Sequence, residues 1–356
     1  MNQSTKLNST ILKSVSKPGR YAGGEYGEII KNKENIKARF AFCFPDTYEI
    51  GMSNLGMRLL YGALNQSNDV WCERVFTPWT DMQEKMREHD LPLTALESGD
   101  PLSAFDFIGF TLQYEMCYTN VLNMLALAKL PLRTKDRGEN DPIIIGGGPC
   151  SYNAEPIADF FDMFNIGEGE DMLPSIVRLY IQMKDEGRYT RKDFLHEAAK
   201  TIPGVYVPSL YEVTYNEDGT IKAYTPVYDD IPKQVTKQII KDLDKVYFPD
   251  KVVMPYIETV HDRIMLEVYR GCIRGCRFCQ AGMVTALCAK RVRMFLIAKL
   301  RCFMTPRDMR KFPWLPFLSA ITLLLSRFAI SSSIGPMTTW SAFLCPRSAW
   351  IALARI

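Results

Sequence analysis

Three cysteines on one short segment are the residues whose type and spacing are most suggestive of chemistry. Residues 270–279 read R-G-C-I-R-G-C-R-F-C, which gives Cys272, Cys276 and Cys279 the spacing C-x3-C-x2-C. Thiolates are soft, charged donors that suit iron–sulfur clusters, and glycines between them allow a loop to wrap closely. Three thiolates can hold three corners of a cubane and leave the fourth iron open to an external chelate. The spacing therefore predicts an iron–sulfur site.

A structural zinc site is the alternative interpretation of the same cysteines. Such sites usually take four ligands in paired C-x2-C units, and the next cysteine, Cys288, lies nine residues beyond Cys279. Ten cysteines in 356 residues are too few for a disulfide scaffold. The polar N-terminus lacks an export signal, so we expect a cytoplasmic chain with reduced thiols. Under those conditions a tight cysteine group indicates a metal site or a redox motif.

The cysteine segment resembles the signature of the radical S-adenosylmethionine (radical SAM) superfamily, C-x3-C-x-aromatic-C after the first barrel strand. Phe278 occupies the aromatic position. The resemblance implies that Cys272, Cys276 and Cys279 bind a 4Fe–4S cluster and that Phe278 lies beside the adenine of S-adenosylmethionine. It also implies reductive cleavage of S-adenosylmethionine to methionine and a 5′-deoxyadenosyl radical, with a low-potential electron donor of flavodoxin or ferredoxin type as partner.

The chain before the cysteines alternates short apolar runs with helical patterns. We expect strands at Ala38–Phe44, Val70–Phe76, 105–112, 143–145 and 160–166, and helices at 54–64, 81–89, 117–130 and 172–184. This alternation predicts an α/β fold with a doubly wound parallel sheet of Rossmann or flavodoxin type, whose ligands bind at the carboxyl ends of the strands. A hairpin is expected around the turn N-E-D-G at 216–219. A strand at 264–268 is expected to open a second domain, which the radical SAM resemblance implies is the start of a partial TIM-type barrel.

A second constellation lies in the loops that follow the expected strands. Asp46, Tyr48 and Gly51 follow the first strand, Thr111 ends the third, and Gly146 and Gly147 follow the fourth. This layout resembles the cobalamin-binding domain of many radical SAM enzymes, with its pattern D-x-H-x-x-G, a Ser/Thr loop and G-G. Tyr48 stands where that pattern has the cobalt-ligating histidine. Either cobalamin binds without a lower axial ligand from the protein, or the domain no longer binds cobalamin. The glycines have a simpler alternative explanation as tight turns.

Charge and composition divide the chain into unlike parts. Residues 285–356 hold 11 Lys and Arg and one acid, so the first 284 residues hold 43 − 11 = 32 basic and 40 − 1 = 39 acidic residues. We expect a loosely held lead-in at 1–36, the cobalamin-binding-like domain at 37–184, a connector with a small β element at 185–250, the start of the barrel at 251–284, and an anomalous tail at 285–356. Glu73 and Arg74 lie in a stretch that resembles the family, with solvated surface charges as the simpler interpretation. Glu115 and Asn120 are candidate ligand groups, although polar loop residues more often have no such role.

The tail fits neither domain. Its apolar stretch at 314–330 is interrupted by Pro316 and Arg327, which argues against a membrane span. The residues at the start of the tail can be encoded by codons that, when read one nucleotide earlier, encode Y-R-P-V-R-E-K-S-P-D-V. That sequence is similar to the continuation of the family's cluster loop. We therefore expect a frameshift after Val284, with a genuine basic extension as the alternative.

Function follows from the cysteine segment and its resemblance. The leading hypothesis is a radical SAM iron–sulfur enzyme of unknown substrate, of which this chain lacks most of the barrel and is expected to be inactive. The alternatives are a non-enzymatic α/β module that binds cobalamin or a nucleotide, and a structural metal protein. Neither composition nor motifs indicate a membrane or nucleic-acid partner.

Overall fold

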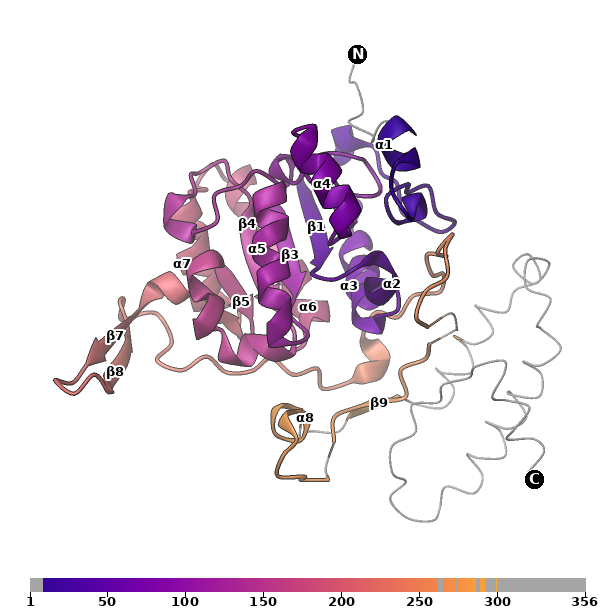
Figure 1. Cartoon of the computed structure of the whole chain (residues 1–356). Coiled ribbons are helices and arrows are strands. Elements are labelled where there is room, and N and C mark those ends of the chain that lie inside the picture. The colour runs from indigo at the N-terminus through magenta and orange to yellow at the C-terminus, as the bar shows by residue number, and fades with distance from the viewer. Residues whose placement is uncertain (1–8, 262–264, 273, 286–288, 292–298, 300–356) are drawn as a thin grey trace, which may run out of the picture. The chain divides into compact units, whose positions relative to one another are not determined.

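The computed structural model describes residues 9–261, 265–272, 274–285, 289–291 and 299. The chain divides into two compact units, whose described residues are drawn in Figure 1. The first consists of Met1–Ile240 and Val253–Thr259, and the second of Lys241–Val252 and Val260–Ile356. Each unit is described by itself.

A six-stranded sheet forms the centre of the first unit. Its strands lie in the order β2-β1-β3-β4-β5-β6, the first five parallel and the last antiparallel. This arrangement confirms the predicted α/β fold, and the order of the parallel strands is that of flavodoxin-like sheets. The strands are β1 (Ala38–Phe44), β2 (Val70–Phe76), β3 (Phe107–Thr111), β4 (Ile143–Gly147), β5 (Met163–Asn165) and β6 (Val205–Tyr206).

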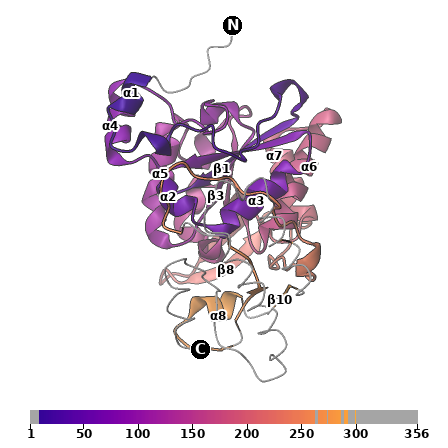
Figure 2. The ribbon, with the colours of Figure 1, turned by 90° about the vertical axis from the view of Figure 1, so that its right-hand side faces the viewer.

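Helices cover both faces of this sheet. α4 and α5 pack together on one face, whereas α6 contacts α3 and α7 on the other (Figure 2). Side-chain caps begin two of them: Asn54 accepts from the Met57 amide at 3.0 Å before α3, and Thr190 accepts from the Asp193 amide before α7. The helices of this unit are α1 (Ser9–Lys13), α2 (Tyr48–Gly51), α3 (Leu55–Asn65), α4 (Thr80–Glu88), α5 (Tyr118–Leu127), α6 (Gly169–Asp185) and α7 (Arg191–Thr201).

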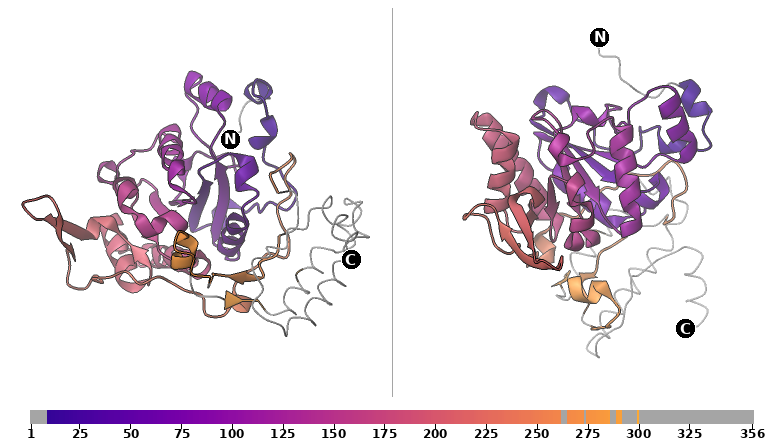
Figure 3. Two further views of the ribbon diagram at one scale, coloured as in Figure 1. Left: turned by 60° about the horizontal axis from the view of Figure 1, so that its bottom comes forward. Right: turned by 60° about the vertical axis from the view of Figure 1, so that its left-hand side comes forward.

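The sheet unit continues past residue 184. Helix α7 packs against α6, and β6 joins the sheet edge beside β5. After β6, the predicted hairpin is present as β7 (Tyr211–Tyr215) and β8 (Ile221–Pro226), with a turn at 216–219. It projects from the sheet unit (Figure 3) and leaves Tyr215 and Ile221 exposed. Sequence reasoning found the hairpin but missed α7 and β6.

Two adjacent charges lie inside β2, which contradicts their interpretation as solvated surface residues. The side chains of Glu73 and Arg74 are 0% and 2% exposed. Glu73 accepts from the Arg39 guanidinium, and Arg74 pairs with Glu97 at 2.7 Å. Because these partners lie far away in the sequence, a local pattern of charges could not reveal the pairs.

The lead-in before β1 is held firmly where the structure describes it, contrary to expectation. Glu25 is buried and its Oε2 lies 2.6 Å from the Arg74 Nη2. Arg20 is also buried and pairs with Glu49 at 2.9 Å. The Trp71 indole of β2 donates to the Ile29 carbonyl. The lead-in is therefore held against β2 through the side chains of Arg74 and Trp71.

The second unit holds the cysteine segment between short elements. β9 (Tyr269–Arg270) pairs antiparallel with β10 (Ala289–Lys290), and α8 (Gln280–Val284) lies between them in the chain. The predicted strand at 264–268 is wrong for its described part, because residues 265–268 form no strand. The only described strand partner in this unit is β10, so the extended pairing of a barrel strand is absent there. The barrel itself is not confirmed.

Most of the expected tail lies outside the described residues, which beyond Thr285 comprise only 289–291 and 299. Arg291, one of these, is 5% exposed, and its guanidinium pairs with Glu267 at 3.2 Å and lies over the Phe248 ring. No helix in the described part of the chain combines the length and apolar character needed to span a membrane.

We predict that Arg74→Leu destabilises the protein by about 3–5 kcal/mol, because it leaves the buried carboxylates Glu97 and Glu25 without their cation. Lys85→Ala is the control, since its ion pair with Glu88 lies on the surface, where such pairs contribute little to stability. Urea unfolding followed by circular dichroism measures both. Equal midpoints for the two variants would contradict the structural importance of Arg74.

Candidate functional site

The carboxyl ends of the parallel strands lie at one edge of the sheet. The chain leaves β1 towards β2 and leaves β3 in the opposite direction towards β4, so the point where connections diverge lies between β1 and β3. Ligands of open α/β sheets bind at such a point. Asp46 follows β1, and Thr111 at the end of β3 pairs in register with Gly147 at the end of β4. The predicted loop residues are thus brought to a common edge.

Asp46 and Tyr114 form a hydrogen bond that joins the loops after β1 and β3. The Tyr114 hydroxyl donates to Asp46 Oδ2 at 2.7 Å, and this bond, ahead of burial, raises the pKa of Tyr114 to about 12. The Asn120 amide, a predicted ligand candidate, donates instead to the Pro45 carbonyl at 3.0 Å. Sequence reasoning missed Tyr114, although its phenol on the loop directly after a predicted strand was an available signal.

Tyr48 is a residue of the interior and does not offer a metal ligand. It is 2% exposed, its ring lies edge-on to Phe76 with centroids 5.1 Å apart, and its hydroxyl donates to the buried Glu25. Burial and the Glu25 carboxylate raise the pKa of the Tyr48 phenol. The residue at the expected cobalt-ligating position therefore does not fit that role, and we derive no chemistry through cobalamin.

Two of the predicted glycines are explained by packing within the sheet unit. A Cβ on Gly51 would lie 2.3 Å from the Phe76 ring, and one on Gly146 would lie 2.6 Å from the Phe164 ring. Gly147 is different, since a Cβ there would meet Asn165 at an ordinary 3.6 Å. Glycine is therefore required at 51 and 146 for steric reasons. This structural role accounts for both glycines without a bound ligand.

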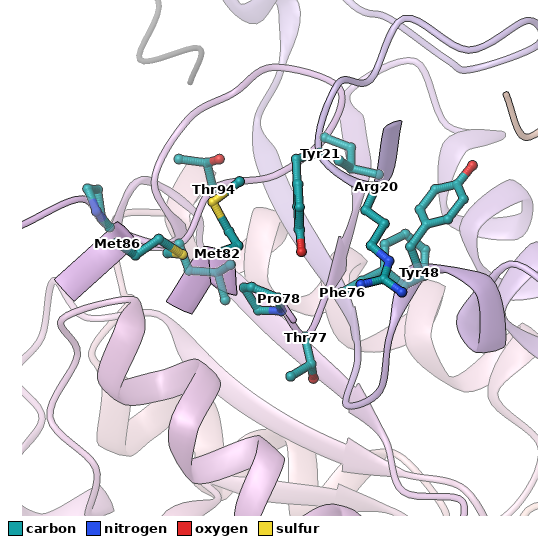
Figure 4. A pocket seen from close by; sticks show the side chains of 12 residues that line it. Arg20, Tyr21, Tyr48, Phe76, Thr77, Pro78, Met82, Met86 and Thr94 are labelled. Carbon is teal, nitrogen blue, oxygen red and sulfur yellow. The ribbon is translucent and has the colours of Figure 1, made fainter. Parts of the chain in front are cut away.

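A small hollow lies beside the end of β2 (Figure 4). It is lined by Arg20, Tyr21, Tyr48, Phe76, Thr77, Pro78, Met82, Met86, Pro92, Leu93, Thr94 and Leu96. Its principal polar groups are already engaged: Arg20 pairs with Glu49, and the Tyr21 hydroxyl accepts from the Trp79 amide at 3.0 Å. The hollow therefore offers mainly apolar walls, and we assign no ligand to it.

The cysteine loop of the second unit is accessible to solvent. Cys276 is exposed, Cys272 and Cys279 are half-buried, and Phe278 is 93% exposed. The Cys272 amide donates to the Thr285 carbonyl at 2.9 Å and closes the base of the loop, while the Cys279 amide donates to the Cys276 carbonyl. Gly271 and Gly275 have φ values of +89° and +64°, a conformation that favours glycine.

The donor chemistry of this loop fits an iron–sulfur cluster. It supplies three accessible thiols, and no disulfide joins the described cysteines. No three Cys, His, Asp or Glu side chains among the described residues lie close enough together to hold one metal ion. Binding of one cluster by all three thiols would therefore require that the loop bring them together, as in sites where metal binding is coupled to local folding.

Comparison with known proteins gives a family match within the first unit. A family model described as "Radical SAM proteins, N-terminal" matches residues 56–208. The chain is 27% identical over 261 residues to an uncharacterized protein of Methanocaldococcus jannaschii, and the match covers 72% of this chain and 43% of that protein. The chain thus spans less than half of that relative's length. No solved structure matches it. The family match supports assignment to the radical SAM superfamily.

We predict that Tyr48→Phe destabilises the protein by about 1–3 kcal/mol, because it removes a buried hydrogen bond to a carboxylate. Tyr114→Phe is the matched comparison: Tyr114 is 41% exposed, so loss of its hydroxyl should destabilise the protein less than loss of the buried Tyr48 hydroxyl. Urea unfolding of both variants provides the measurement. A Tyr48→Phe variant with the stability of the wild type would contradict the structural role given to that phenol.

We also predict that Tyr114 titrates at about pH 12 and that Asp46→Asn returns its pKa towards the usual value near 10. Because the folded pKa is raised, the contribution of this pair to stability is present below about pH 10 and is lost between about pH 10 and 12. NMR of ring-labelled tyrosine, assigned with Tyr114→Phe, follows the titration. Titration of wild-type Tyr114 near pH 10 would contradict the hydrogen bond.

Proposed function

We propose that this chain derives from a radical SAM enzyme in which Cys272, Cys276 and Cys279 hold a 4Fe–4S cluster. The observation that carries the proposal is the order of two features along one chain. A domain matched as the N-terminal part of radical SAM proteins precedes a loop with three thiols in the spacing C-x3-C-x2-C. A structural zinc site would not explain the preceding match.

Each residue of the loop has a defined part in this proposal. The three thiols bind the cluster as thiolates, and the Cys272–Thr285 backbone bond holds the two ends of the loop together. Phe278, exposed as the structure stands, would lie against the adenine of S-adenosylmethionine. When bound, the cluster supplies the electron for reductive cleavage of S-adenosylmethionine.

The α/β unit suggests a second candidate function, a ligand-binding module. Its favouring observation is the point between β1 and β3 where the strand connections diverge, bordered by the Asp46–Tyr114 pair. Nucleotide or corrinoid binding that survives loss of all three loop cysteines would support this candidate over the enzyme.

The composition of residues 285–356 differs from that of the preceding chain. We propose that the reading frame changes after Val284, so that the basic, apolar residues beyond it differ from those of the parent protein. Sequencing the DNA across codons 280–290 tests the frameshift. An uninterrupted frame that encodes the printed residues would contradict it.

We predict that anaerobic reconstitution with iron and sulfide loads the wild-type chain with a cluster, and that alanine at Cys272, Cys276 or Cys279 abolishes its visible absorption. Each replacement removes one of three required thiolates. Cys150→Ala is the control, because Cys150 is buried in the sheet unit at 3% exposure. Iron analysis and electron paramagnetic resonance provide the readouts. Iron loss from Cys150→Ala, or tight zinc binding without iron in the wild type, would contradict the assignment.

A further inference from the structure

The hairpin β7–β8, which projects from the sheet unit (Figure 3), carries one apolar face. Val213 lies opposite Tyr224, and Tyr215 lies opposite Ile221. Side chains alternate between the faces of a strand, so these four share one face. Tyr215 and Ile221 are 62% and 65% exposed, and the residues that the structure describes supply no third strand. Because a hairpin of two strands is only marginally stable in water, a further strand would stabilise it.

The outer edge of β7 presents backbone groups without a strand partner. The Val227 amide donates to the Leu210 carbonyl at 2.8 Å, at the base of the hairpin. Bonded pairs recur at every second residue of an antiparallel ladder, so the even-numbered residues of β7 bond to β8. Val213 and Tyr215 therefore direct their amides and carbonyls away from β8. Within the described part of the chain, β8 is the sole strand beside β7.

The outer edge of β8 differs, because it carries features that prevent strand pairing. The register shifts by one residue at Lys222, which forms a bulge and is exposed. Pro226, at the end of β8, has no N–H to donate. Bulges, lysines and prolines are the devices that protect sheet edges from further pairing. The sequence of β7, Y-E-V-T-Y, contains neither lysine nor proline, so one of the two edges is open.

We propose that this open edge pairs with β7 of a second copy of the chain, antiparallel about a twofold axis at Thr214. The contact goes beyond the proposed function and does not depend on it. Tyr211 is buried and its amide already donates to the Pro208 carbonyl, so the overlap begins at the next residue. Pairing of residues 212–216 with their copies places Thr214 at the centre.

The side chains are complementary to themselves in this register. Val213 faces the second copy's Tyr215, which is the favourable combination of a β-branched and an aromatic residue. Thr214 faces its own copy, where two hydroxyls can form a hydrogen bond. Glu212 faces Asn216, so no like charges meet. These pairs favour a second copy of this chain over a partner of different sequence.

Neighbouring registers are less favourable. Centring the pair on Glu212 would place two Glu212 carboxylates opposite each other, and centring it on Tyr215 would place Glu212 opposite Asp218. The contact uses five residues per copy, which is less than the surface of about 800 Å² per partner in a standard interface. We therefore expect a weak dimer that forms as concentration rises. The protected β8 edges stop the assembly at two copies.

The first experiment tests the twofold axis in the full chain by disulfide crosslinking. Directly opposed residues of such a non-hydrogen-bonded pair have Cα atoms about 4.5 Å apart, within the range that a disulfide spans. Thr214→Cys should therefore crosslink to its own copy under mild oxidation. Thr225→Cys is the matched control, because Thr225 is an exposed threonine on the same face but on β8. Mass spectrometry of the linked peptides separates this bond from those of other cysteines.

The second experiment measures the dimer by sedimentation velocity under reducing conditions. A residue that faces its own copy repels it with either sign of charge. Thr214→Glu and Thr214→Lys should therefore both raise the dissociation constant by about two- to fivefold, and salt should relieve both effects. Thr225→Glu and Thr225→Lys should leave the dissociation constant unchanged. Circular dichroism of each variant confirms that the fold is retained.

Three results would overturn the pairing. A wild-type chain that stays monomeric at every concentration would exclude it. A dimer that neither crosslinks through Thr214→Cys nor responds to charge at this position would use another surface. A monomer whose Val213 and Tyr215 amides exchange slowly with deuterium would show that another segment of the same chain covers the edge. Crosslinking through Thr214→Cys alone, with weakening by both charges, would support the proposal.

Discussion

A guanidinium enclosed within an edge strand needs buried carboxylates, and Arg74 obtains them from two distant segments. Glu97 comes from the loop between α4 and β3, and Glu25 from the lead-in before β1. Removing a cation from such a site leaves unpaired charges at high cost. The lead-in is thereby fixed along β2, and its Glu25 in turn receives the Tyr48 hydroxyl. The packing at this side of the sheet, including α2, depends on this one charge.

The same network limits what the loop after β1 can do. Tyr48 is committed to the interior, so the side chain available at this edge is Asp46, which already pairs with Tyr114. The polar groups at the strand ends are largely satisfied by one another. Chemistry that requires free nucleophiles or ligands is therefore better placed on the exposed cysteine loop of the second unit.

Sequence reasoning succeeded where local patterns determine structure. The limits of β1 and β2 were predicted to the residue, because each is a short, mostly apolar and aromatic run ended by Pro45 or by Thr77 and Pro78. It failed where distant partners decide the outcome. Glu73 and Arg74 read as surface charges because Arg39, Glu97 and Glu25 are not near in sequence. Helix α7 was missed because its sequence, R-K-D-F-L-H-E-A-A-K-T, is mostly polar and buries only a narrow stripe.

The candidate site was predictable to different degrees. The cysteine spacing carries its chemistry in the sequence alone, and the structure adds the loop closure and the exposure of Cys276 and Phe278. The Asp46–Tyr114 bond joins residues 68 positions apart and could be found only from the folded sheet.

The position of β1 has a consequence for dividing this protein into pieces. The segment matched to the family, 56–208, begins within α3 and so excludes β1, which lies between β2 and β3. A fragment cut at those limits would lack the strand that joins one side of the sheet to the other, and with it the lead-in that is held against β2. The segment matched by the family model is therefore smaller than the sheet that must fold, and an autonomous fragment must begin upstream of residue 38.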